Sequence, residues 1–149
     1  VENTGHLGQS ALLAEAFGIE SGDAPHVNLS AEKASAAVIS AARKSIRACT
    51  DLADGGLALA VFEMADAAKM GVCLTTENIS QLFGEDQARY LVACAPDQVA
   101  ALEAAAKAHG TALAKVGIFG GESVTFGADP PSMAELSRLY RTAFERAIG

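Results

Sequence analysis

The chain lacks tryptophan and is poor in aromatic and cationic side chains. Aromatic residues make up 5% of its 149 residues, and 11 Lys and Arg stand against 18 Asp and Glu, giving a formal net charge of -7. Nucleic acids and anionic membranes are bound mainly through Lys and Arg, so the acidic balance argues against both as partners. Half of the residues are hydrophobic, and much of this share is alanine, which favours closely packed helices over an aromatic-rich β-sandwich.

Long apolar segments are absent as well. No apolar run approaches the ~20 residues of a membrane span, and the N-terminus has neither the basic nor the apolar region of a signal peptide. We therefore expect a cytoplasmic protein. The sequence begins at Val1 without an initiator methionine, which suggests a fragment cut from a longer polypeptide.

Metal and nucleotide signatures are missing too. The three cysteines, Cys49, Cys73 and Cys94, are isolated, form no C-x-x-C pair and have no histidine nearby, so we expect no zinc site and reduced, buried thiols. The sequence contains no Walker A, G-x-G-x-x-G, H-E-x-x-H or G-x-S-x-G pattern. We assign no catalytic residue and no metal ligand.

The residues that are present alternate between helical and extended patterns. Ser30 is placed to cap a long alanine-rich helix, and Ser132 opens a capping box with Glu135. No repeat or linker divides the chain, so we expect a single domain over 1–149 with an α+β or α/β fold. The predicted helices cover 10–17, 31–47, 56–69, 97–108 and 133–147, and a short helix opened by Thr76 or Asn78 runs toward Leu82. The predicted strands cover 48–52, 72–75, 89–95 and 113–119, with 123–126 returning as a hairpin partner.

The first candidate site is the turn at 51–57, which reads Asp-Leu-Ala-Asp-Gly-Gly-Leu. Asp54 is placed to cap the amphipathic helix that follows. Backbone N–H groups of Gly55 and Gly56 could approach a phosphate at the helix N-terminus, while Asp51 suits a cation or hydroxyl better. An ordinary turn before a capped helix is the alternative.

Two further segments are candidates. In the loop at 82–90, Gly84 permits close backbone approach, and Glu85 and Gln87 could meet a sugar hydroxyl or an amide; a solvated connection is the alternative. At 4–10, His6 lies between two glycines before a helix and could serve as an acid or base, although it has no acidic or nucleophilic neighbour in sequence.

These three motifs, in this order and spacing, resemble the phosphoribosylformylglycinamidine synthases, the PurL-type synthetase subunits. The similarity covers essentially the whole chain and is to the last module of those enzymes, which is related to the C-terminal domain of aminoimidazole ribonucleotide synthetase. It rests on Gly-His-Leu-Gly-Gln-Ser at 5–10, the 51–57 turn with the helix behind it, and 82–92.

The resemblance implies a three-layer α/β/α domain on a mixed β-sheet. It implies a part in converting formylglycinamide ribonucleotide to formylglycinamidine ribonucleotide with ATP, Mg and glutamine-derived ammonia. The implied partners are the remaining nucleotide-binding domains of the same chain, a glutaminase subunit and a small bridging subunit. The implied substrate- or phosphate-binding residues are Asp51, Asp54, Gly55, Gly56, Gly84 and Glu85, with His6 and Gln87 as further candidates.

The chain departs from the family pattern at three positions. Ala53 stands where the family usually has serine, and the usual Gly-Glu-Ser-Gln-Gly-Arg run carries Asp86 and Ala88 in place of serine and glycine. Asp86 would repel a phosphate placed directly against it. The Asp-Gly-Gly turn resembles the version found in the second of the family's two such modules. The turn could therefore border either the working nucleotide site or a structural one.

Two other functions remain as alternatives. One is a stand-alone, non-catalytic interaction domain of the same fold. The other is a fragment of a sibling ATP-dependent enzyme, such as aminoimidazole ribonucleotide synthetase or selenophosphate synthetase. We expect the fragment to be inactive alone, because the nucleotide-binding domains are not part of this sequence.

Overall fold

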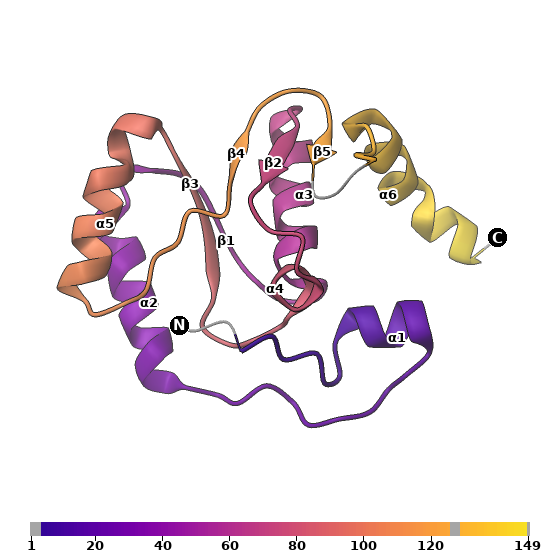
Figure 1. The fold of residues 1–149 in the computed structure, drawn as a ribbon, viewed down its shortest axis with the longest axis horizontal. Coiled ribbons are helices and arrows are strands. Elements are labelled where there is room, and N and C mark those ends of the chain that lie inside the picture. Colours follow the sequence, from indigo (N-terminus) through magenta and orange to yellow (C-terminus); the bar gives the residue numbers. More distant parts are fainter. Residues whose placement is uncertain (1–3, 126–128, 149) are drawn as a thin grey trace. The chain divides into compact units, whose positions relative to one another are not determined.

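The computed structural model of the chain describes residues 4–125 and 129–148 (Figure 1). The end of the predicted strand 123–126, Phe126, lies outside these residues. The described parts form two compact units, one from Val1–Ala60 with Asn78–Lys115 and one from Val61–Glu77 with Val116–Gly149. The single domain over 1–149 stays a prediction. None of the described helices combines the length and apolarity that a bilayer span requires.

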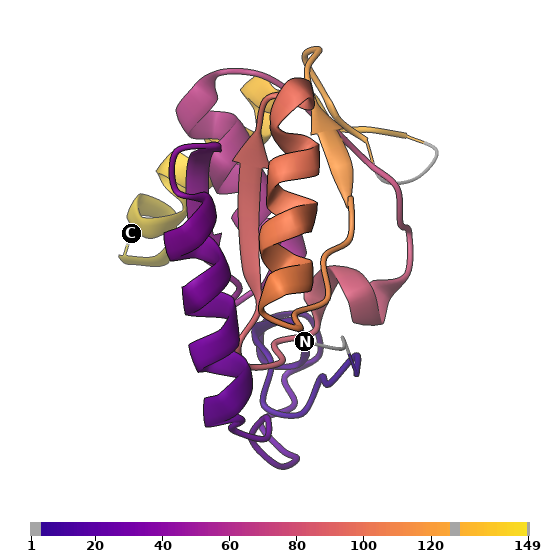
Figure 2. The same ribbon diagram turned by 90° about the vertical axis from the view of Figure 1, so that its left-hand side faces the viewer.

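The first unit holds a two-stranded antiparallel sheet, β1–β3, in which Thr50 pairs with Leu91 and Asp51 with Tyr90. Helices α2 and α5 pack side by side on one face of this sheet (Figure 2). Its elements are α1 (Ala11–Phe17), α2 (Leu29–Ala42), β1 (Ile46–Asp51), the start of α3 (Gly56–Ala68), α4 (Ile79–Phe83), β3 (Tyr90–Cys94), a 3-10 turn (Pro96–Gln98) and α5 (Val99–Ala108).

The second unit holds a mixed three-stranded sheet. β2 (Val72–Leu74) lies between β4 (Gly117–Phe119), which is antiparallel to it, and β5 (Val124–Thr125), which is parallel to it. The last helix, α6 (Met133–Ile148), follows. One of the two bonds of the predicted capping box is present at its N-terminus, where the Glu135 N–H donates to Ser132 Oγ at 3.2 Å.

The predicted hairpin between 113–119 and 123–126 is wrong, because β4 and β5 lie on opposite sides of β2. The turn between them wraps around the start of β2. The Gly71 N–H donates to Gly121 O at 2.7 Å, and the Gly120 N–H donates to Gly71 O at 2.8 Å. A Cβ at Gly71 would lie 2.4 Å from Ser123 O, so this close approach requires glycine.

The α+β class is confirmed, but two details of the prediction change. The segments 90–94 and 117–119, expected in one sheet, belong to separate sheets. The helix expected over 31–47 spans Leu29–Ala42 instead, because Asn28 rather than Ser30 supplies the cap, with Oδ1 3.0 Å from the Ala31 N–H. Beyond Ala42 the chain turns at Ser45, and Ile46 enters β1.

The expectation of buried cysteines is also wrong. Cys49 and Cys73 are exposed and Cys94 is half-buried, and all three are free thiols. In β1 and β2, burial alternates from residue to residue, and Cys49 and Cys73 fall on the outward positions. Strand alternation therefore overrides the general tendency of cysteine to be buried.

Candidate functional site

The three sequence motifs meet at one side chain of the first unit, Glu85. Its Oε1 accepts hydrogen bonds from the Ala11 N–H at 2.9 Å and from the Gly55 N–H at 2.8 Å. Its own N–H donates to His6 O at 3.2 Å. The segments 4–10, 51–57 and 82–90 therefore lie together around Glu85.

The glycine turn, however, does not present its N–H groups to a ligand. The Gly55 N–H is taken by Glu85, and the Gly56 N–H donates to Ala53 O at 2.9 Å. The expectation that both point toward a phosphate is wrong for this structure, because a carboxylate of the protein already lies at the start of α3. Among the described hydrogen bonds, none joins the exposed Asp54 carboxylate to α3, so its predicted cap is not formed.

Gly56 has a packing role instead. Its φ is +59°, and a Cβ there would lie 2.8 Å from Gly84 O and 2.9 Å from Leu82 O. Backbone of the 82–84 segment therefore packs directly on the first residue of α3. Glycine at this position allows both the left-handed conformation and the close approach.

The side chains of Asp86 and Arg89 are largely buried. Asp86 is 7% exposed and its Oδ1 accepts a hydrogen bond from the Thr4 hydroxyl. Arg89 Nη1 donates to Gly84 O at 2.9 Å and lies 3.9 Å from Asp86 Oδ2. Burial lowers the pKa of Arg89, and the Asp86 charge acts in the opposite direction. Asp86 therefore braces the 84–89 loop, and it is not among the residues lining the neighbouring cleft.

A cleft of about 310 Å³ lies beside these three segments. Four carboxylates line it, from Glu32, Asp51, Asp54 and Glu85, and Arg89 is the one cationic side chain of the lining. An acidic lining disfavours a bare phosphate and suits hydroxyl, amide or cationic groups of a ligand. The complete lining is Gln9, Pro25, Glu32, Asp51, Leu52, Ala53, Asp54, Glu85, Gln87, Ala88, Arg89 and Tyr90.

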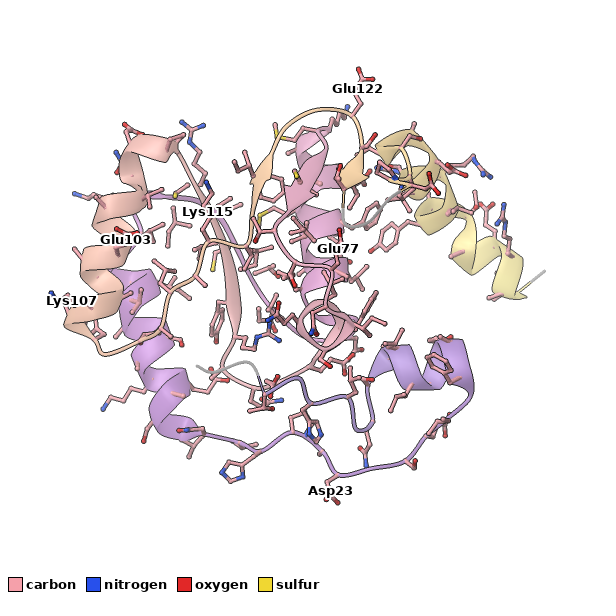
Figure 3. The ribbon with its side chains drawn as sticks, in the orientation of Figure 1. Asp23, Glu77, Glu103, Lys107, Lys115 and Glu122 are labelled. Carbon is pink, nitrogen blue, oxygen red and sulfur yellow. The ribbon has the colours of Figure 1, made fainter. Side chains whose placement is uncertain are left out.

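The structure brings some of the predicted site residues into this cleft and leaves others out. Asp51, Asp54, Glu85 and Gln87 line it, whereas Gly55, Gly56 and Gly84 do not. His6 does not line it: its Nε2 lies 2.8 Å from Asp23 O. In Figure 3 the Asp23 side chain points away from the ribbon.

Two residues of the lining, Pro25 and Glu32, lie outside the three segments that the sequence singled out. Glu32 comes from α2, and its Oε2 accepts a hydrogen bond from the Tyr90 hydroxyl at 3.1 Å. No local pattern links these residues, which are 58 positions apart. The bond to Glu32 raises the pKa of Tyr90, with smaller contributions from burial and nearby charges.

The described residues combine helices with two small sheets in an α+β arrangement, and the three ordered motifs meet beside a cleft of the first unit. The family model described as AIR synthase related protein, C-terminal domain, matches residues 2–127. The chain belongs to this family.

Similar proteins carry one name. The chain is 61% identical to "Phosphoribosylformylglycinamidine synthase subunit PurL" of Cereibacter sphaeroides over 97% of its own length and 20% of that protein. It is 54% identical to the protein of the same name in Roseobacter denitrificans, over 99% of the chain and 20% of that protein. For Rhodospirillum rubrum the identity is 42% over 90% of the chain and 19% of that protein. The chain thus spans about a fifth of these relatives.

Ala88 adopts a left-handed conformation, with φ +61°, at the position where the resemblance places glycine. We predict that Ala88→Gly keeps the free energy of unfolding within about 0.5 kcal/mol of the parent, because relieved strain offsets the lost methyl group and the greater chain entropy. In the control Ala36→Gly, on the exposed face of α2, the same change should cost about 1 kcal/mol. Urea denaturation measures both. Equal losses in the two variants would contradict the strain at Ala88.

The two tyrosines of the chain each donate to a carboxylate, Tyr90 to Glu32 and Tyr140 to Glu63 at 2.7 Å. These bonds raise the pKa of each tyrosine above its ordinary 10. Each bond therefore stabilises the folded protein fully below pH 10, and this stabilisation is lost as the pH rises through the raised pKa of the tyrosine. In a tyrosinate absorbance titration, Glu32→Gln should lower the pKa of Tyr90 alone. Glu63→Gln, the matched control, should lower that of Tyr140 alone. A titration unchanged by either variant would refute these bonds.

Proposed function

We propose that this chain is the C-terminal domain of an ATP-dependent ligase of purine biosynthesis. The complete enzyme would convert formylglycinamide ribonucleotide to formylglycinamidine ribonucleotide with glutamine-derived ammonia. The observation that carries the proposal is 61% identity over nearly the whole chain to a protein named as such a synthase subunit. A sibling synthetase fragment is less favoured, because the relatives reported above at 42–61% identity all carry the synthase name.

ATP and Mg would be held elsewhere in the complete enzyme. Within the described residues, no three His, Cys, Asp or Glu side chains converge in a way that could hold a metal ion. The cleft is lined by four carboxylates and one cationic side chain, Arg89, a balance that disfavours a triphosphate. Because the resemblance places nucleotide binding in the other domains, we assign it to the four fifths of the relatives that this chain does not cover.

The cleft would contribute polar contacts to a ligand at the border of this domain. Asp51 and Gln87 would accept or donate hydrogen bonds to hydroxyl, amide or amine groups, and Asp54 would add negative charge at the rim. Gly55, Gly56 and Gly84 would serve by letting the backbone segments pack closely. His6 would hold the loop at Asp23 through its contact with Asp23 O and would not take part in acid–base chemistry.

We assign the partners and the compartment on the same basis. The partners would be the nucleotide-binding domains of the same chain, a glutaminase subunit and a small bridging subunit. Three free thiols, two of them exposed, suit the reducing cytoplasm.

The test uses the protein encoded by the complete reading frame, purified with its glutaminase and bridging subunits. We expect amidine formation from formylglycinamide ribonucleotide, ATP, Mg and glutamine, and no turnover by the 149-residue chain alone. Asp51→Asn in the complete protein should lower kcat/KM about 10-fold through a lost contact. Asp97→Asn, on the exposed 3-10 turn, should leave it unchanged.

Three results would contradict the proposal. The first is a complete protein that forms no amidine, and the second is turnover by the isolated chain. The third is a reading frame that begins near Val1, which would favour the stand-alone interaction domain.

A further inference from the structure

The Glu85 carboxylate joins two backbone segments that lie far apart in the sequence. A single oxygen, Oε1, accepts hydrogen bonds from the Ala11 N–H at 2.9 Å and the Gly55 N–H at 2.8 Å. These donors lie 74 and 30 positions away in sequence. The side chain is half-buried and also lines the acidic cleft. One side chain thus ties two remote backbone segments together at the wall of the cleft.

The backbone of Glu85 adds a third link. Its N–H donates to His6 O at 3.2 Å, so the segment before α1 is held at two points, His6 and Ala11. On the other side, the Gly55 bond fixes the turn that carries Asp51 and Asp54 into the cleft. Movement of the Glu85 carboxylate would therefore move cleft-lining residues of the 51–54 turn.

We propose that Glu85 is a positioning residue of the cleft: it sets the geometry of the 51–54 turn through its reach and its acceptor oxygen, and it does not serve as a charged contact for the ligand. The statement that the cleft binds a ligand rests on the proposed function. The positioning role differs from the role that resemblance implies, in which Glu85 binds substrate or phosphate directly.

Two substitutions separate the roles. Glu85→Gln removes the charge but keeps an acceptor oxygen at the same reach. Glu85→Asp keeps the charge but withdraws the carboxylate by about 1.5 Å, too far to accept from both N–H groups. If Glu85 positions the turn through its reach, Glu85→Gln should keep the function of the cleft and Glu85→Asp should lose it. If Glu85 is instead a charged contact for the ligand, Glu85→Asp should keep more of that function than Glu85→Gln. Glu103 on the exposed face of α5, labelled in Figure 3, offers matched Gln and Asp controls.

The first measurement is amide hydrogen exchange of the complete protein, which requires no assumption about its activity. Glu85→Asp should speed exchange about tenfold in the segments 5–11 and 51–57 together, while Glu85→Gln and both Glu103 variants stay near the parent. Unchanged exchange in Glu85→Asp, faster exchange in only one segment, or equal effects of Asp and Gln would overturn the proposal.

The second measurement is kcat/KM for amidine formation by the same variants. Misplacing the turn should lower kcat/KM about 10-fold or more in Glu85→Asp, with Glu85→Gln within about 3-fold of the parent. The opposite order would make Glu85 a charged contact and overturn the proposal. Absence of activity in the parent protein would refute the proposed function, and the exchange measurement would still decide whether Glu85 positions the turn.

Discussion

The first unit depends on one carboxylate oxygen placed between two chain segments that begin helices. The first N–H groups of a helix have no partner within the helix, and an acceptor from elsewhere must satisfy them. Glu85 supplies that acceptor at the start of α1 and immediately before α3. Both bonds lie in a half-buried setting that limits competition from water.

Other features of the unit keep Glu85 in place. The 82–84 backbone packs on Gly56 so closely that no side chain fits there. Arg89 holds Gly84 O, and Asp86, buried beside it, accepts from Thr4. The acidic cleft is the surface left by this arrangement, with its carboxylates carried on α2, on β1 and the turn that follows it, and on the loop before β3.

The fold could be predicted from the sequence where local signals decide. Ser10, Asn78 and Ser132 cap their helices because each acceptor is three residues from its donor. Strand order could not be predicted, since the positions of β4 and β5 depend on the close approach at Gly71. For the site, the three motifs were visible, but the hydrogen bonds that link them span 30 to 79 residues and the Glu32–Tyr90 bond spans 58. Local reasoning therefore assigned the glycine N–H groups to a ligand when a side chain of the same chain satisfies one of them.

The most direct test of this account compares the Ala11 and Gly55 amide proton shifts by NMR in the complete, isotope-labelled protein and in Glu85→Ala, which removes the acceptor oxygen. If both N–H groups donate to Glu85 Oε1, both amide protons move upfield together in Glu85→Ala and keep the parent's shifts in the control Glu103→Ala. A shift of only one amide proton, or of neither, would contradict the account and show that the two helix starts are held independently.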